Sequence, residues 1–195
     1  MRGWNSAAGV GSWVVRQTAW LNRSEMADSD TTPETPLRLI VMGVAGSGKT
    51  TIGLRLGEAL DVEYVEADDA HPPTNVEKMA AGIPLTDADR QPWLETLASR
   101  LAARTRVVIS CSALKRSYRD VLRAAGGVTF VCLDLPPAVA RHRAGDRTDH
   151  FMGPNMIDSQ FATLEPPTAD ETDVITVDAT ATPAEIVAAI VDRVG

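Results

Sequence analysis

The sequence has very little cysteine. Its 195 residues contain only Cys111 and Cys132, too few for the disulfide framework of a small secreted domain. Both lie in or beside apolar runs, so we expect two buried thiols that pack as small side chains. Nothing near Cys111 in the sequence supplies an activating base, which argues against a nucleophilic cysteine. This pattern indicates a reducing compartment, and we expect a cytoplasmic protein.

Positive charge and long apolar stretches are also scarce. The chain has 19 Lys and Arg against 26 Asp and Glu, a net charge of −7, and no block rich in lysine or arginine. A nucleic-acid backbone needs a basic surface, so nucleic acid is not an expected partner. No apolar stretch approaches the roughly 18 residues that cross a membrane, so no membrane partner is expected. At 44% hydrophobic residues, the composition fits one folded domain with one core.

The first 36 residues differ in composition from the rest. They contain three of the four tryptophans, and their longest apolar stretch is too short for a secretory signal. A transit-type segment is one interpretation, and the other is that translation starts at Met26. Residues 27–36 are polar and contain proline, which is typical of disorder. We expect residues 1–36 to be a disordered or mis-annotated extension and residues 37–195 to be the folded domain.

Beyond residue 36, short apolar runs alternate with segments of helical spacing. This alternation predicts an α/β domain with a parallel sheet covered by helices on both faces. Ligands of such sheets bind beyond the carboxyl ends of the strands. The expected strands span 37–42, 62–66, 106–110, 128–133 and 173–177, and the expected helices span 49–60, 87–104, 115–125, 136–144, 155–164 and 183–193. An apolar stripe on the second of these helices is expected in the core, namely Trp93, Leu94, Leu97 and Leu101.

The first expected strand runs directly into a glycine-rich loop, Gly43–Thr50. Its glycines let successive backbone N–H groups point into one concavity, which the positive end of the next helix also faces. In such a loop Lys49 reaches the β- and γ-phosphates, and the Thr50 hydroxyl ligates Mg²⁺. A glycine-rich turn with an incidental lysine is the alternative, but it does not explain the preceding strand. We expect a bound nucleoside triphosphate, with contacts from Gly43, Val44, Ala45, Gly46, Ser47, Gly48, Lys49, Thr50 and Thr51.

Polar groups follow the other expected strands. Asp68 follows the second strand, where it could accept a proton from an acceptor hydroxyl; a helix cap or an outer-sphere partner of Mg²⁺ are the alternatives. His71, before Pro72-Pro73, lies in a stiff non-helical turn that suits a fixed hydrogen-bond donor, or is an exposed structural histidine. Arg143 and Arg147 are four residues apart and could close over the phosphates as a lid, although arginines at this spacing are often simply exposed. Together these groups suit phosphoryl transfer to a small hydroxylated acid.

These residues resemble gluconokinase, the small P-loop type that phosphorylates D-gluconate at its 6-hydroxyl with ATP. The resemblance extends from about residue 38 to residue 193. The phosphate loop is shared by many enzymes, whereas the other blocks in this order are specific to the family. The matching blocks are Met42–Thr50, Asp68 with His71-Pro72, Asn75–Met79, Gly82–Arg90 with Pro92–Leu94, Cys111–Lys115 with Tyr118-Arg119, His150–Met152, and Ser159-Gln160 through Leu164-Glu165.

The resemblance implies a nucleoside-monophosphate-kinase-like, three-layer fold. It further implies a five-stranded parallel sheet in the order 2-3-1-4-5, a small lid, and ATP and Mg²⁺ as cofactors. A homodimer and a role in gluconate catabolism feeding the pentose phosphate pathway are also implied. Carried over to this sequence, the catalytic residues are Lys49, Asp68, Arg143 and Arg147, and the metal ligand is Thr50. The substrate-binding residues implied in the same way are Asp68, His71, Lys78, Arg90, Ser112, Lys115 and Arg119.

Departures from the family pattern leave alternatives open. The family usually has glycine at the position of Ala67 and apolar residues at those of Asp69 and Ala70, so the extra carboxylate could shift the base or the metal. The same architecture serves kinases of other acceptors, such as shikimate or a nucleoside monophosphate. Substrate choice must then come from residues 68–90 and 112–119. A nucleotide-binding module without turnover is the alternative from another class, although it would need no base.

Overall fold

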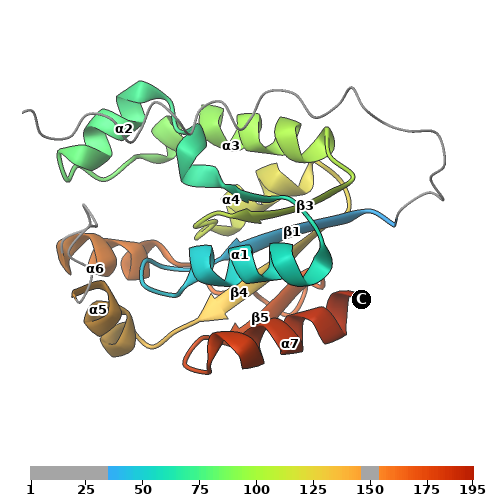
Figure 1. Ribbon diagram of the computed structural model, residues 1–195. Coiled ribbons are helices and arrows are strands. Elements are labelled where there is room, and N and C mark those ends of the chain that lie inside the picture. Colours follow the sequence, from blue (N-terminus) through green and yellow to red (C-terminus); the bar gives the residue numbers. More distant parts are fainter. Residues whose placement is uncertain (1–34, 146–153) are drawn as a thin grey trace, which may run out of the picture. The chain divides into compact units, whose positions relative to one another are not determined.

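The computed structural model describes residues 35–145 and 154–195, which form a three-layer α/β domain (Figure 1). The five strands in these residues are parallel and lie in the order β2-β3-β1-β4-β5, which confirms the sheet order that the resemblance implied. Of the expected N-terminal extension, only residues 35 and 36 are described, and they carry no regular structure. The strands are β1 Leu37–Met42, β2 Tyr64–Glu66, β3 Arg106–Ser110, β4 Val128–Asp134 and β5 Val174–Asp178.

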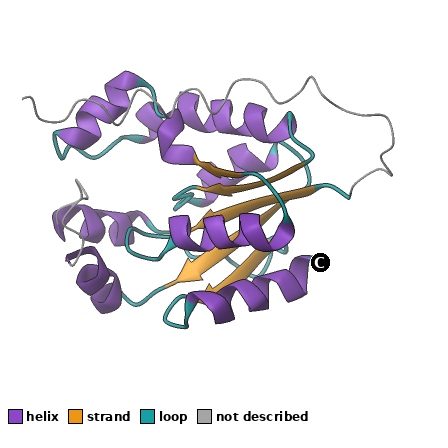
Figure 2. Cartoon of the chain, viewed as in Figure 1, coloured by secondary structure: helices purple, strands orange, loops and turns teal. Residues whose placement is uncertain are grey.

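Helices cover both faces of the sheet, as expected. Helices α1 and α7 pack together on one face, and α3 and α4 pack together on the other (Figure 2). The six helices expected from the spacing are all present, with ends shifted by at most two residues. The helices are α1 Lys49–Leu60, α2 Pro73–Ala80, α3 Asp87–Ala102, α4 Arg116–Arg123, α5 Pro137–Gly145, α6 Pro154–Thr163 and α7 Pro183–Val194.

The core is built around the central strand β1. Its residues Leu39, Ile40 and Val41 are fully buried, because a parallel strand with helices on both faces has no solvent side. Ile52 and Leu56 of α1 pack into one cluster with this strand. The apolar stripe of α3 is also buried, which confirms the expected core face of that helix.

Two short helical elements between β2 and α3 were not expected. A 3₁₀ helix, η2, spans Ala67–Ala70, and α2 begins at Pro73. His71 and Pro72 are extended, as the two prolines suggested. Pro73 nevertheless opens a helix, because the first helical position needs no backbone N–H and favours the proline φ angle.

The strand ends that are followed by candidate site residues all lie at one edge of the sheet. The strands run from right to left in Figure 1, so the loop after β1, η2 after β2 and the loop after β3 meet at the left edge. This is the edge at which ligands bind in open parallel sheets. In the part of the chain that the structure describes, no helix combines the length and apolar character needed to cross a bilayer.

Candidate active site

The loop after β1 has the backbone of a phosphate-binding loop. Gly46 and Gly48 have φ angles of +81° and +94°, which strain any residue with a side chain. A Cβ atom on Gly46 would also lie 2.8 Å from the carbonyl oxygen of Ala140. Gly48 is the N-cap of α1, whose first turn contains no acidic residue. The partial positive charge of this helix end is therefore available to an anion.

The side chains of the loop also fit an anion. Ser47 is buried, and among the described residues its hydroxyl oxygen has no hydrogen-bond partner. Lys49 Nζ donates to the carbonyl oxygen of Val44 at 3.0 Å, which holds the ammonium group against the loop. The Ala45 N–H donates to Gln160 Oε1 of α6 at 2.6 Å. Phosphate oxygens would give the buried hydroxyl a partner and would accept hydrogen bonds from the ammonium group.

A carboxylate that the sequence pattern did not single out lies beside Thr50. Glu66, the last residue of β2, accepts hydrogen bonds from the hydroxyls of Thr50 at 2.9 Å and of Tyr64 at 2.8 Å, and also from Ser110. Burial, reinforced by the charge of Glu66, raises the pKa of Tyr64, so its hydroxyl stays a donor. A hydroxyl and a carboxylate that suit Mg²⁺ thus adjoin the phosphate loop. The available signal was the place of Glu66 as the last residue of the expected strand 62–66, at the end where ligands of parallel sheets bind.

Asp68 lies in η2, directly after β2, with a half-exposed carboxylate. Its Oδ1 atom is 3.8 Å from Nε2 of His71. The backbone beside it is anchored from the core, because the indole N–H of Trp93 donates to the carbonyl oxygen of Ala67 at 3.0 Å. The expected base therefore stands at the edge of the site on a backbone held by a buried side chain.

His71 is buried, so the alternative of an exposed structural histidine is wrong. Its ring stacks on Trp93 with centroids 4.1 Å apart. Burial, followed by the charge of Arg90, lowers the pKa of His71 to about 4, so the ring is neutral at pH 7. Asn75 Nδ2 donates to the carbonyl oxygen of Asp89 at 2.9 Å and lies 3.3 Å from His71 Nδ1. Because the amide nitrogen of Asn75 can only donate, we assign Nδ1 of His71 as the acceptor. The ring proton is then on Nε2, next to the expected base.

Three of the cations expected to bind substrate gather at the first turn of α3. Lys78 Nζ lies 2.6 Å from Asp89 Oδ1, and Lys115 Nζ lies 2.7 Å from Asp87 Oδ2. The hydrogen bond from Lys78 holds the pKa of Asp89 at about 2, and that from Lys115 lowers the pKa of Asp87. Arg90 follows Asp89 directly in the helix. The structure thus brings together, from α2, α3 and the start of α4, three positive groups suited to an anionic acceptor.

The other two substrate-binding candidates follow β3 and differ from each other. The Ser112 carbonyl oxygen accepts the N–H of Gly43 at 3.3 Å, so this residue lies beside the phosphate loop. Arg119 is 1% exposed, and its Nε and Nη2 atoms donate to Glu171 at 2.7 and 2.6 Å. The structure therefore pairs Arg119 with Glu171 and does not bring it together with the other candidates. Its contact with a substrate stays a prediction.

A groove adjoins the phosphate loop on the side of β5. Arg143 on α5 donates from Nη1 to the carbonyl oxygen of Ala179 at 2.9 Å, and both residues line the groove. Arg147 and the other expected lid residues at 146–153 lie outside the described residues. The remaining lining residues are Gly46, Ser47, Gly48, Thr51, Ile52, Ala181, Pro183 and Ile186.

The cysteines do not contribute to the site. Cys111 and Cys132 are both buried, and burial raises their pKa values to about 12 and about 11. This confirms packed, unreactive thiols. No group of three or more His, Cys, Asp and Glu residues that could hold a metal occurs within 35–145 and 154–195. A Mg²⁺ ion near Thr50 would therefore take most of its ligands from phosphate oxygens and water.

The chain is similar in sequence and in fold to known kinases. Residues 45–195 match the family described as shikimate kinase. A probable gluconokinase of Schizosaccharomyces pombe is 44% identical over 149 residues, 71% of this chain and 77% of that protein. The gluconokinase of Gluconobacter oxydans is 46% identical over 141 residues, 70% of this chain and 79% of that protein. The crystal structure of a gluconokinase from Sinorhizobium meliloti superimposes with a TM-score of 0.75 at 44% identity, covering 83% of this chain and 95% of that one.

Proposed function

Because the chain belongs to the gluconokinases, within the shikimate kinase family, we propose that it transfers the γ-phosphoryl group of ATP to the 6-hydroxyl of D-gluconate. The products are 6-phospho-D-gluconate and ADP. One observation carries the proposal: the phosphate loop, the carboxylate of Asp68 and the cations at the start of α3 lie at one edge of one sheet. A donor phosphate and an anionic alcohol would meet there. The identity to gluconokinases supports gluconate as that alcohol.

At the donor side, the loop amides and Lys49 bind the β- and γ-phosphates. The Thr50 hydroxyl would hold Mg²⁺, and Glu66, 2.9 Å from that hydroxyl, would hold it directly or through water. When bound, the ion neutralises charge on the phosphates. The groove beside Arg143 and Ala179 takes the nucleoside.

At the acceptor side, Asp68 accepts the proton of the 6-hydroxyl. The oxygen of that hydroxyl forms a bond to the γ-phosphorus, the bond to the β,γ-bridging oxygen breaks, and ADP leaves. His71 donates its Nε2–H to a hydroxyl of the sugar acid. Its pKa of about 4 keeps the ring neutral at pH 7. The carboxylate and remaining hydroxyls are bound by Lys78, Arg90, Ser112 and Lys115.

The lid and the assembly complete the proposal. Arg143, together with Arg147 in the segment 146–153, stabilises the charge that develops on the moving phosphoryl group. The kinase domain is residues 37–195, and residues 1–36 are an extension outside it. The enzyme works in the cytoplasm as a homodimer, in gluconate catabolism that feeds the pentose phosphate pathway.

An acceptor panel tests this function. The purified full chain is incubated with ATP and Mg²⁺ and, separately, with gluconate, shikimate, glycerate or AMP, and ADP release is measured. We expect turnover with gluconate and a product phosphorylated at C6 by ³¹P NMR, and almost none in the matched Lys49→Ala variant. The shikimate kinase family match makes shikimate the acceptor to compare most closely. Turnover with another acceptor alone would reject gluconate, and no turnover with any would favour a nucleotide-binding module.

A further inference from the structure

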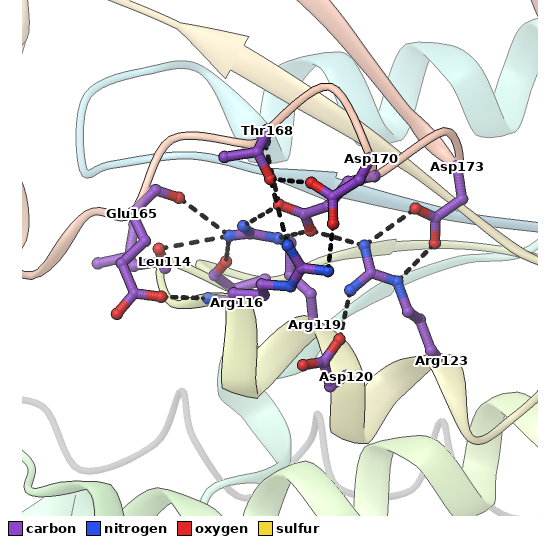
Figure 3. A network of polar contacts seen from close by, with 11 residues as sticks. Leu114, Arg116, Arg119, Asp120, Arg123, Glu165, Thr168, Asp170 and Asp173 are labelled. Carbon is purple, nitrogen blue, oxygen red and sulfur yellow. Dashed lines mark hydrogen bonds and ion pairs between the residues drawn. The ribbon is translucent and has the colours of Figure 1, made fainter.

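A buried ion pair joins α4 to the segment before β5 (Figure 3). Arg119 donates from Nε and Nη2 to the two carboxylate oxygens of Glu171, and both side chains are 1% exposed. Removing two charges from water offsets much of what their attraction contributes. A gain in stability therefore does not by itself explain the pair. The third nitrogen of the Arg119 guanidinium, Nη1, makes other contacts.

Nη1 contacts backbone carbonyl oxygens of two segments, the loop after β3 and the segment after α6. Nη1 of Arg119 lies 3.3 Å from the carbonyl oxygen of Ala113, 3.5 Å from that of Leu114 and 3.2 Å from that of Glu165. Glu165 reinforces the junction, since its own N–H donates to the Leu114 carbonyl at 2.9 Å. One planar guanidinium thus serves a carboxylate and the loop after β3 at once, through nitrogens that are spread in a fixed fork, whereas the donors of a lysine all leave from one nitrogen.

The loop that Arg119 holds is strained. Ala113 has a φ of +42°, in the left-handed region that a residue with a Cβ disfavours, and it is buried. On one side of it, the Ser112 carbonyl accepts the first amide of the phosphate loop, the N–H of Gly43. On the other side, Lys115 is the N-cap of α4 and reaches Asp87 at the acceptor edge. Strain of this kind persists only where the surroundings enforce it.

We propose that Arg119 is a positioning residue that keeps the segment 112–115 in this left-handed conformation. In doing so it keeps the Ser112 carbonyl on the phosphate loop and directs Lys115 to the acceptor, so that donor and acceptor sites stay in register. Glu171 orients Arg119 for this task. This inference rests on the proposed function for its kinetic consequences, but its structural part does not depend on the identity of the acceptor.

The kinetic test is a double-mutant cycle between Arg119→Lys and Ala113→Gly. Arg119→Lys keeps the positive charge beside Glu171 but loses the contacts to the loop carbonyls. We expect kcat/KM for gluconate to fall by about tenfold or more, because the donor and acceptor sides are no longer in register. Glycine adopts a positive φ without strain, so adding Ala113→Gly should restore at least about threefold of the loss.

Arg123→Lys is the matched control. Arg123 shares Glu171 with Arg119, at 2.6 Å, and its other hydrogen bonds go to Asp120 and Asp173 rather than to the loop after β3. It should lower the unfolding temperature and leave the gluconate KM unchanged. If Arg119→Lys does not fold, the charge-free pair Arg119→Met with Glu171→Met replaces it in the same cycle.

Amide hydrogen exchange provides a second readout that needs no substrate. In Arg119→Lys the Gly43 amide should exchange faster than in the wild type and in Arg123→Lys, and adding Ala113→Gly should slow it again. Two results overturn the inference: no rescue by Ala113→Gly in either readout, or an Arg119→Lys enzyme with wild-type gluconate kinetics. Failure of the proposed function would appear differently. The wild-type protein would not phosphorylate gluconate, but the Gly43 amide would still exchange faster in Arg119→Lys and more slowly again after Ala113→Gly is added.

Discussion

Replacing Trp93 with phenylalanine tests how the core holds the candidate base. The Trp93 side chain is 1% exposed, stacks on His71 and donates its indole N–H to the carbonyl oxygen of Ala67. Phenylalanine keeps an aromatic ring but has no N–H, so this carbonyl loses its indole partner. Ala67 precedes Asp68, and the variant should therefore lose both stability and the placement of the base.

The size of both effects follows from these contacts. Leaving a buried carbonyl without its partner costs about 1–3 kcal/mol, so we expect the free energy of unfolding to fall by about 2 kcal/mol. In a chain of this size each kcal/mol corresponds to about 2–4 °C, which gives a melting temperature lower by about 4–8 °C. Because displacing a catalytic group by about 1 Å can cost up to about a hundredfold, we expect kcat to fall by about tenfold or more.

Thermal unfolding and steady-state kinetics with ATP and gluconate measure the two effects. Leu97→Ala is the matched control: Leu97 is fully buried in the same stripe of α3, and its truncation costs about 2–5 kcal/mol through a cavity. Its side chain has no group that could donate to Ala67, so kcat should stay within about twofold of the wild type. If Trp93→Phe keeps the wild-type kcat, or loses no more kcat than Leu97→Ala, the anchoring argument is refuted.

Three further substitutions test other parts of the site. Gly53→Ala would place a Cβ 2.3 Å from the Tyr64 ring, so thermal unfolding should show a loss of stability instead of the roughly 1 kcal/mol gain usual in a helix. Glu66→Gln removes the charge beside the Thr50 hydroxyl, so the Mg²⁺ concentration for half-maximal activity should rise by about tenfold or more; an unchanged titration would contradict a metal role. In the folded protein the pKa of His71 is about 4, below its usual value of about 6.5, so protonation favours the unfolded chain. The free energy of unfolding should therefore fall by about 3 kcal/mol as the pH falls from about 6.5 to about 4. His71→Phe keeps the ring stack and should lose less stability over that range; equal losses in the two proteins would show that His71 is not held neutral.

Much of the fold could be predicted from the sequence, because short apolar runs and helical spacing are local signals. Strands β1 and β3 begin and end where the pattern placed them. The sheet order came only from the family resemblance, since alternation of strands and helices allows several orders. Helix α2 was missed because Pro72-Pro73 suggested a break, whereas Pro73 occupies the one helical position that suits it.

The candidate site was less predictable, because its pairings join residues far apart in the chain. Lys49 and Thr50 were predicted from a local motif, and both lie at the expected strand end. Arg119 and Glu171 are 52 residues apart, and Ala45 and Gln160 are 115 apart. A single sequence carries no signal for such pairs, so nothing in it could show that Arg119 is enclosed.

The turnover number of Asp68→Asn with gluconate tests the central claim most directly. Asparagine keeps the size and shape of the side chain but does not accept the proton of the 6-hydroxyl. The account predicts that kcat falls by about 10²–10⁴-fold, while the KM values for ATP and gluconate change by no more than about threefold. A variant whose kcat stays within about tenfold of the wild type would contradict Asp68 as the base.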